Sequence, residues 1–214
     1  MAGLAALLVA TAPWAGRAGV PGDLRRTAVG SVPEGFSREP VADARGAARY
    51  VGSYIRALGL QGVRVHRVVE TAGRYFVYVG EKEGGREAFA LEVRPDGSLR
   101  AKRFPGMYPE MMWNQKYGHR ARRDPAMVQE PVSLEAARRR AHEAVAAEGL
   151  ALGSPGLYYG YALWPVLDPR GRLVGEVAVD RYGGGVAWER FPGGPVRVTE
   201  IPPEGGEAAG RQGG

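Results

Sequence analysis

The sequence contains no cysteine, which excludes disulfide bonds, thiolate metal sites and cysteine nucleophiles. Lysine is almost as scarce, because only Lys82, Lys102 and Lys116 among the 29 basic residues are lysine. The net charge of +6 therefore comes from arginine, and the arginines are scattered apart from two short groups at 120–123 and 138–140. Nucleic-acid binding usually requires a continuous basic face, so we expect no nucleic-acid partner.

A long apolar run is also missing from the start of the chain, where Leu4 to Ala12 is too short to cross a bilayer comfortably. Small residues follow this run, as at a signal-peptide processing site, although no basic residue precedes it. We predict a signal-like segment at 1–16 and a flexible tether at 17–38, with a buried first helix as the alternative. The protein is then exported (periplasmic, secreted or membrane-tethered on the outer side), and it meets a membrane only through an uncleaved N-terminal segment.

No group of residues forms a recognisable catalytic motif. Glu110 and His119 could supply an acid and a base, but no nucleophile or orienting group accompanies them. The glycines at 183–185 lack the Lys-Ser/Thr of a phosphate-binding loop. We therefore predict no catalytic residues, no cofactor and no enzymatic activity.

Two stretches of similar length have similar borders, which indicates an internal duplication. The first opens with Glu-Pro-Val at residue 39 and closes with Phe-Pro-Gly at 104, and the second opens with Glu-Pro-Val at 130 and closes with Phe-Pro-Gly at 191. We predict repeats at 39–106 and 130–200, a connector at 107–129 and a disordered tail at 201–214.

Each repeat has the pattern of a helix followed by strands. Asp43 and Ser133 are candidate N-caps of the two helices. Strand-like runs follow at 63–69, 75–80, 88–93 and 99–104, and again at 157–167, 173–179 and 185–191. The predicted fold is α+β, with two similar units in which a helix packs on an antiparallel β-meander.

Two hairpin sequences resemble the PepSY domain: FALEVRPDGSL from Phe89 to Leu99 and GEVAVDRYGGGV from Gly175 to Val186. The connector, with Met111-Met112-Trp113-Asn114 and Lys116-Tyr117-Gly118, is similar to that of bacterial tandem-PepSY proteins. The resemblance covers about residues 39 to 200. It implies an exported or membrane-facing module of cystatin-like shape that binds or restrains other proteins, including peptidases, and it implies no catalytic residues.

The connector allows two interpretations. In the preferred one, a tryptophan and flexible methionines fill the gap between the repeats and polar residues fix the chain; the anchor residues are Met111, Met112, Trp113, Asn114, Lys116 and Tyr117. In the alternative, soft ligands hold copper; they are Met107, Met111, Met112 and His119.

We therefore expect a non-enzymatic, extracytoplasmic protein-binding or regulatory module. An exposed sheet face or strand edge would meet another envelope or secreted protein, and the partner could be a peptidase that the module restrains. The alternative function is copper handling by the methionine and histidine side chains of the connector. A small enzyme with a cleft between the repeats is a third, weaker hypothesis.

Overall fold

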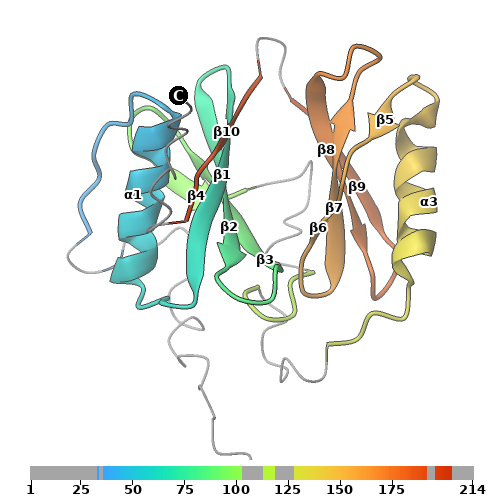
Figure 1. The fold of residues 1–214 in the computed structure, drawn as a ribbon, viewed down its shortest axis with the longest axis horizontal. Coiled ribbons are helices and arrows are strands. Elements are labelled where there is room, and N and C mark those ends of the chain that lie inside the picture. Colours follow the sequence, from blue (N-terminus) through green and yellow to red (C-terminus); the bar gives the residue numbers. More distant parts are fainter. Residues whose placement is uncertain (1–32, 34–35, 103–112, 119–127, 192–195, 204–214) are drawn as a thin grey trace, which may run out of the picture.

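The computed structural model describes residues 33, 36–102, 113–118, 128–191 and 196–203. It contains two helices and two antiparallel sheets arranged in four layers, helix, sheet, sheet and helix (Figure 1). The α+β class predicted from the sequence is confirmed. The signal-like segment, almost all of the tether, most of the connector and most of the tail lie outside the described residues.

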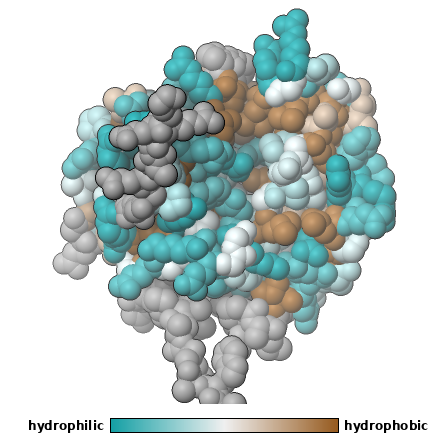
Figure 2. Space-filling model, in the orientation of Figure 1, coloured by the Kyte–Doolittle hydropathy of each residue, from teal (hydrophilic) through white to brown (hydrophobic). Residues whose placement is uncertain are grey.

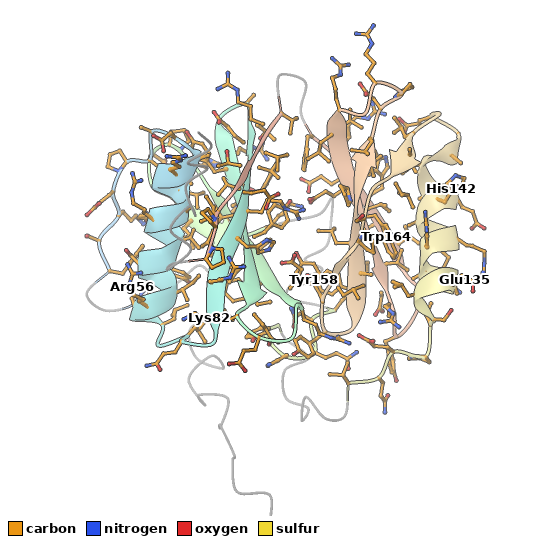
Figure 3. The ribbon with its side chains drawn as sticks, in the orientation of Figure 1. Arg56, Lys82, Glu135, His142, Tyr158 and Trp164 are labelled. Atoms are coloured by element: carbon orange, nitrogen blue, oxygen red, sulfur yellow. The ribbon has the colours of Figure 1, made fainter. Side chains whose placement is uncertain are left out.

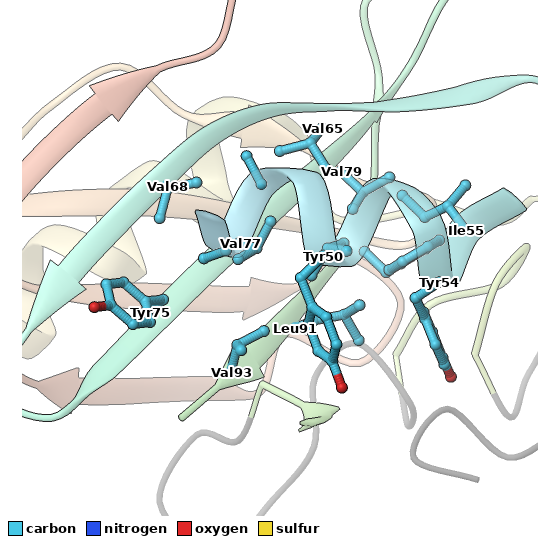
Figure 4. Close-up of a cluster of buried hydrophobic side chains, with 14 of the residues drawn as sticks. Tyr50, Tyr54, Ile55, Val65, Val68, Tyr75, Val77, Val79, Leu91 and Val93 are labelled. Atoms are coloured by element: carbon cyan, nitrogen blue, oxygen red, sulfur yellow. The ribbon is translucent and has the colours of Figure 1, made fainter. Parts of the chain in front are cut away.

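The first sheet has the strand order β10-β1-β2-β3-β4, and α1 (Ala44–Ala57) covers its outer face. Its strands are β1 (Val63–Thr71), β2 (Arg74–Glu81), β3 (Glu87–Val93), β4 (Leu99–Ala101) and β10 (Arg197–Glu200). Asp43 caps the helix by accepting a hydrogen bond from Gly46 N, as the sequence predicts. Figure 4 shows Tyr50, Tyr54 and Ile55 of the helix packed against the valines and Leu91 of the sheet.

The second sheet consists of β5 (Ala151–Leu152), β6 (Gly156–Leu157), β7 (Tyr161–Leu167), β8 (Leu173–Asp180) and β9 (Val186–Arg190). Helix α3 (Leu134–Ala146) covers its outer face with the small side chains of Ala137, Ala141 and Val145. These leave room for Trp164, which is fully buried beneath the helix. The hydroxyl of Ser133 caps the helix at Ala136 N.

The inner faces of the two sheets pack against each other. Their shared core takes apolar residues from both halves of the chain and from the connector: Val69, Phe76, Tyr78, Ala90, Trp113, Tyr158, Tyr161, Leu163, Ala178, Ala187 and Phe191. Phe76 of β2 stacks on Phe191 after β9, with ring centroids 5.3 Å apart. Each sheet is therefore covered by a helix on one face and by the other sheet on the second face.

Three features differ from the sequence prediction. The strand expected at 157–167 is interrupted at 158–160, because the chain turns there and Gly160 has φ 95°. The two-residue strand β5 was not predicted, since so short a run has no detectable alternation. Residues 197–200, assigned to the second repeat, instead form β10 and pair with β1, with Val198 opposite Val69.

No helix within the described ranges is long and apolar enough to cross a membrane.

Candidate functional site

The connector residues that the structure describes lie at the junction of the two halves. Trp113 is 5% exposed and packs edge-on against Tyr161, with ring centroids 6.3 Å apart. Tyr161 in turn stacks on Tyr158, which lies between the two sheets (Figure 3). Both tyrosines and Trp164 are fully buried and belong to the core.

Asn114 and Gln115 fix the connector through side-chain amides. Asn114 Nδ2 donates to Ala88 O at 2.7 Å, while its Oδ1 accepts from Lys116 N at 3.0 Å and Tyr117 N at 2.7 Å. Gln115 exchanges two hydrogen bonds of 3.0 Å with the backbone of Gln129. Because both amides are buried, these bonds replace water that the groups have lost.

Glu81, at the end of β2, collects three hydrogen bonds from the connector and the second half. Oε1 accepts from Lys116 Nζ at 2.5 Å and Tyr117 OH at 2.6 Å, and Oε2 accepts from Tyr159 OH at 2.8 Å. The Lys116 ammonium also lies 4.7 Å from the centre of the Tyr159 ring. We call these four residues the Glu81 cluster; it joins the first sheet, the connector and the turn before β7.

The Glu81 cluster has perturbed proton affinities. Burial alone would raise the pKa of Glu81, but the hydrogen bonds from Lys116, Tyr117 and Tyr159 outweigh it and hold the pKa below its ordinary value. Burial and the bond to Glu81 raise the pKa of both tyrosine hydroxyls. At neutral pH the carboxylate is therefore charged and the tyrosines are neutral donors, so each group is already committed to a partner.

Replacing Glu81 by glutamine should change how stability depends on pH. A carboxyl whose pKa is lowered by folding stabilises the native state above its unfolded value near 4.5, and this contribution is lost as the pH falls through the folded pKa. We expect the difference in unfolding free energy between the wild type and Glu81→Gln to be largest at neutral pH and to shrink below about pH 4.5. Urea unfolding at several pH values measures it, and a difference that grows in acid would contradict the assignment.

A second ionic group borders the Glu81 cluster. Glu130, at the opening of the second repeat, pairs with Arg86 at 3.1 Å and with Arg181. Arg86 also donates to Tyr158 O at 3.1 Å and lies over the Tyr159 ring. These contacts hold together the loop after β2, the start of the second half and the turn after β8.

Gly160 allows the connector to approach the second sheet. A Cβ there would lie 2.6 Å from both Trp113 O and Gln115 Nε2, and φ is 95°. We expect Gly160→Ala to lower the free energy of unfolding by about 1–3 kcal/mol through this overpacking, beyond the cost of the positive φ. Gly171→Ala is the matched control, because φ is 74° there and nothing lies within 4 Å. Equal losses for the two variants in denaturant titrations would show that the approach of the connector does not matter.

The inner faces of the sheets also enclose an ion pair. Lys102, which follows β4, is 0% exposed, and its ammonium lies 2.5 Å from Glu176 Oε2 on β8 and 3.2 Å from Glu189 Oε2 on β9. Tyr78 on β2 donates to the other oxygen of Glu176 at 2.5 Å. Burial raises the pKa of Glu189 despite the opposing effect of Lys102. We call this group the Lys102 cluster.

The structure thus places four of the predicted anchor residues, Trp113, Asn114, Lys116 and Tyr117, in one junction. Met111 and Met112 lie outside the described residues, as do Met107 and His119 of the copper alternative. Within the described residues no group of three His, Cys, Asp or Glu side chains could hold a metal ion. Sequence reasoning did not find Glu81, Glu130 or Glu176.

The scarcity of lysine is the signal that could have found these clusters. Two of the three lysines, Lys102 and Lys116, form ion pairs of 2.5 Å with carboxylates between the halves. An ammonium is compact, so it fits between two acceptors where the wider, planar guanidinium does not. In a chain that otherwise uses arginine, a lysine therefore indicates a confined ionic contact.

Comparisons with known proteins add little. No family model matches the sequence, and no curated protein matches it. Among solved structures, the Bacillus megaterium YpeB C-terminal domain matches with 13% identity and a TM-score of 0.26, over 71% of this chain and 64% of that chain. The match thus spans less than two thirds of that chain, and at this TM-score it carries no argument about fold or function.

Proposed function

We propose that this protein is a non-enzymatic binding or regulatory module that acts outside the cytoplasm and meets another protein through the free edge of β9. The observation that carries the proposal is the coverage of the sheets. Both faces of each sheet are buried, by a helix on one side and by the other sheet on the second. The exposed sheet face considered from the sequence is thus not available, and strand edges are the remaining sheet surfaces.

Strand β9 has an edge suited to pairing with another strand. Asp180 N donates to Gly185 O and Phe191 N donates to Val174 O, so the odd-numbered residues direct their backbone groups at β8. Val186, Trp188 and Arg190 therefore direct theirs away from the sheet, and within the described residues no strand pairs on that side. Val186 is 41% exposed and nearby Tyr182 is 44% exposed. An extended peptide could add there by β-augmentation.

The ionic clusters support a binding role over a catalytic one. The carboxylates of Glu81, Glu130 and Glu176 each have two or more hydrogen-bond or ion-pair partners within the protein. A general acid or base must instead be able to bond to its substrate. Their geometry instead joins the two halves. This is the arrangement expected of a rigid module that presents an edge to a partner.

The likeness between the halves is part of the proposal. In each half a capped helix is followed by antiparallel strands, and the helix covers one face of the sheet that these strands form. This common order supports two PepSY-like units that arose by duplication and then packed sheet to sheet. A restrained peptidase is the partner class that the PepSY resemblance suggests.

The experiment places a charge on the edge. The wild type, Val186→Lys and Ala151→Lys are used as bait for proteins from the envelope fraction and, separately, from the cytosolic fraction of the native host. Lysine at an exposed edge opposes strand pairing, so Val186→Lys should lose the partner. Ala151→Lys adds the same charge to β5, an exposed edge position of the same sheet, and should retain it. A partner that all three baits bind equally would refute binding at β9, and a partner found only among cytosolic proteins would refute the extracytoplasmic role.

A further inference from the structure

Arg67 of β1 places a cation in the interface between the sheets, where its close contact is with an aromatic ring. Its side chain faces the second sheet, where the guanidinium lies 4.3 Å from the centre of the Tyr78 ring. Its Nε is buried without a hydrogen-bond partner, and Arg67 makes no ion pair with any of the described residues. Buried or half-buried arginines normally pair with an anion, because desolvating an unpaired charge is costly.

The neighbouring carboxylates of Glu176 and Glu87 attract the Arg67 charge, but their hydrogen bonds go to other groups. Glu176 accepts from Lys102 and Tyr78, and Glu87 lies 2.6 Å from His66 Nε2. His66 is half-buried at this contact. Glu200 lies opposite Arg67 in the register of β1 and β10, yet it is exposed and makes no ion pair with it. The stacked guanidinium thus retains N–H groups that an external acceptor can use.

An apolar surface lies beside this cation. Val198 of β10 is 48% exposed and lies opposite Val69, two residues from the pair of Arg67 and Glu200. Arg67 and Val198 are therefore diagonal neighbours on one face of an antiparallel pair, and such residues lie about 7–8 Å apart. Figure 2 shows apolar residues gathered on the upper part of this face, in the region of β10 and the upper ends of β7 and β8.

We propose that Arg67 and Val198 form a binding site for a carboxylate that carries a branched aliphatic group. The carboxylate would accept hydrogen bonds from the guanidinium, which remains partly exposed, while the aliphatic group packs on Val198. Such a ligand could be a free branched-chain acid or the C-terminal residue of a peptide, since both present the same two groups. The site lies on the β1 and β10 side of the molecule and does not depend on the proposed role of β9.

The test uses NMR of the full-length chain labelled with nitrogen-15, which reports the Nε–Hε resonance of Arg67. The probes are isovalerate, N-acetylvaline as the mimic of a peptide terminus, and N-acetylvalinamide, which lacks the carboxylate. We expect saturable shifts of the Arg67 resonance with one or both carboxylates and none with the amide. The stronger carboxylate identifies the source of the ligand.

Variants locate the site. Because a charge-assisted hydrogen bond contributes substantially to affinity, Arg67→Gln should weaken binding at least about tenfold. Arg197→Gln makes the same charge change next to Val198 in β10, but on the opposite face of the sheet, and should leave binding unchanged. Should Arg67→Gln fail to fold, the three probes on the wild type still decide. Equal shifts with N-acetylvaline and N-acetylvalinamide, or no shift with either acid, would overturn the proposal.

Discussion

Replacing Lys102 by methionine should lower the free energy of unfolding by about 3–5 kcal/mol. The methionine fills a similar volume, but Glu176 and Glu189 then remain buried with no cation between them. An uncompensated buried charge costs more than the ion pair itself contributes, because desolvation is no longer offset by attraction. Thermal unfolding should show the loss as a fall in Tm of about 10 °C.

Two further variants separate this effect from a general loss of packing. Lys82→Met removes an exposed lysine and should change stability by less than about 0.5 kcal/mol. Adding Glu176→Gln to Lys102→Met should restore part of the lost stability, because it removes one of the two carboxylates left without a cation. If the losses of the two single variants simply added, the Lys102 cluster would not act as a unit.

Replacing Trp113 by alanine should lower the free energy of unfolding by about 3–5 kcal/mol, because the buried ring contributes to the core between the sheets. Trp113→Phe retains an aromatic ring against Tyr161 and should lose less than Trp113→Ala. The measurement is the free energy of unfolding from denaturant titration. A loss below about 1 kcal/mol for the alanine variant would show that the connector is not an anchor.

Thermal unfolding with and without Cu(I) addresses the copper alternative. In the anchor interpretation, Cu(I) leaves the midpoint of thermal unfolding unchanged in the wild type and in His119→Ala. A rise with Cu(I) that His119→Ala abolishes would instead favour ligation by the methionines and histidine of the connector.

Local pattern predicted most of the elements. The helices follow from caps at Asp43 and Ser133 and from apolar spacing, and the longer strands follow from alternating or continuous apolar runs between turns. These signals are local, so a sequence shows them directly. The α+β class followed from the order of the elements.

The packing of the two sheets could not be predicted in the same way. A strand that is buried on both faces, such as β2 with six consecutive buried residues, shows that both faces are covered but not by what. The pairing of Tyr78 with Glu176, and of Lys102 with Glu176 and Glu189, depends on which inner faces meet. Because the members of each pair are far apart in the sequence, no local pattern indicates these contacts, apart from the rarity of lysine.

The return of β10 to the first sheet has a consequence for synthesis on the ribosome. Strand β1 emerges early, but β10, which pairs with the edge of β1 opposite β2, is made only after the whole second sheet. At a translation rate of about 5–20 residues per second, the interval is on the order of ten seconds. During that time the nascent chain carries an unpaired edge, so a chaperone that binds extended segments would have its longest opportunity at β1.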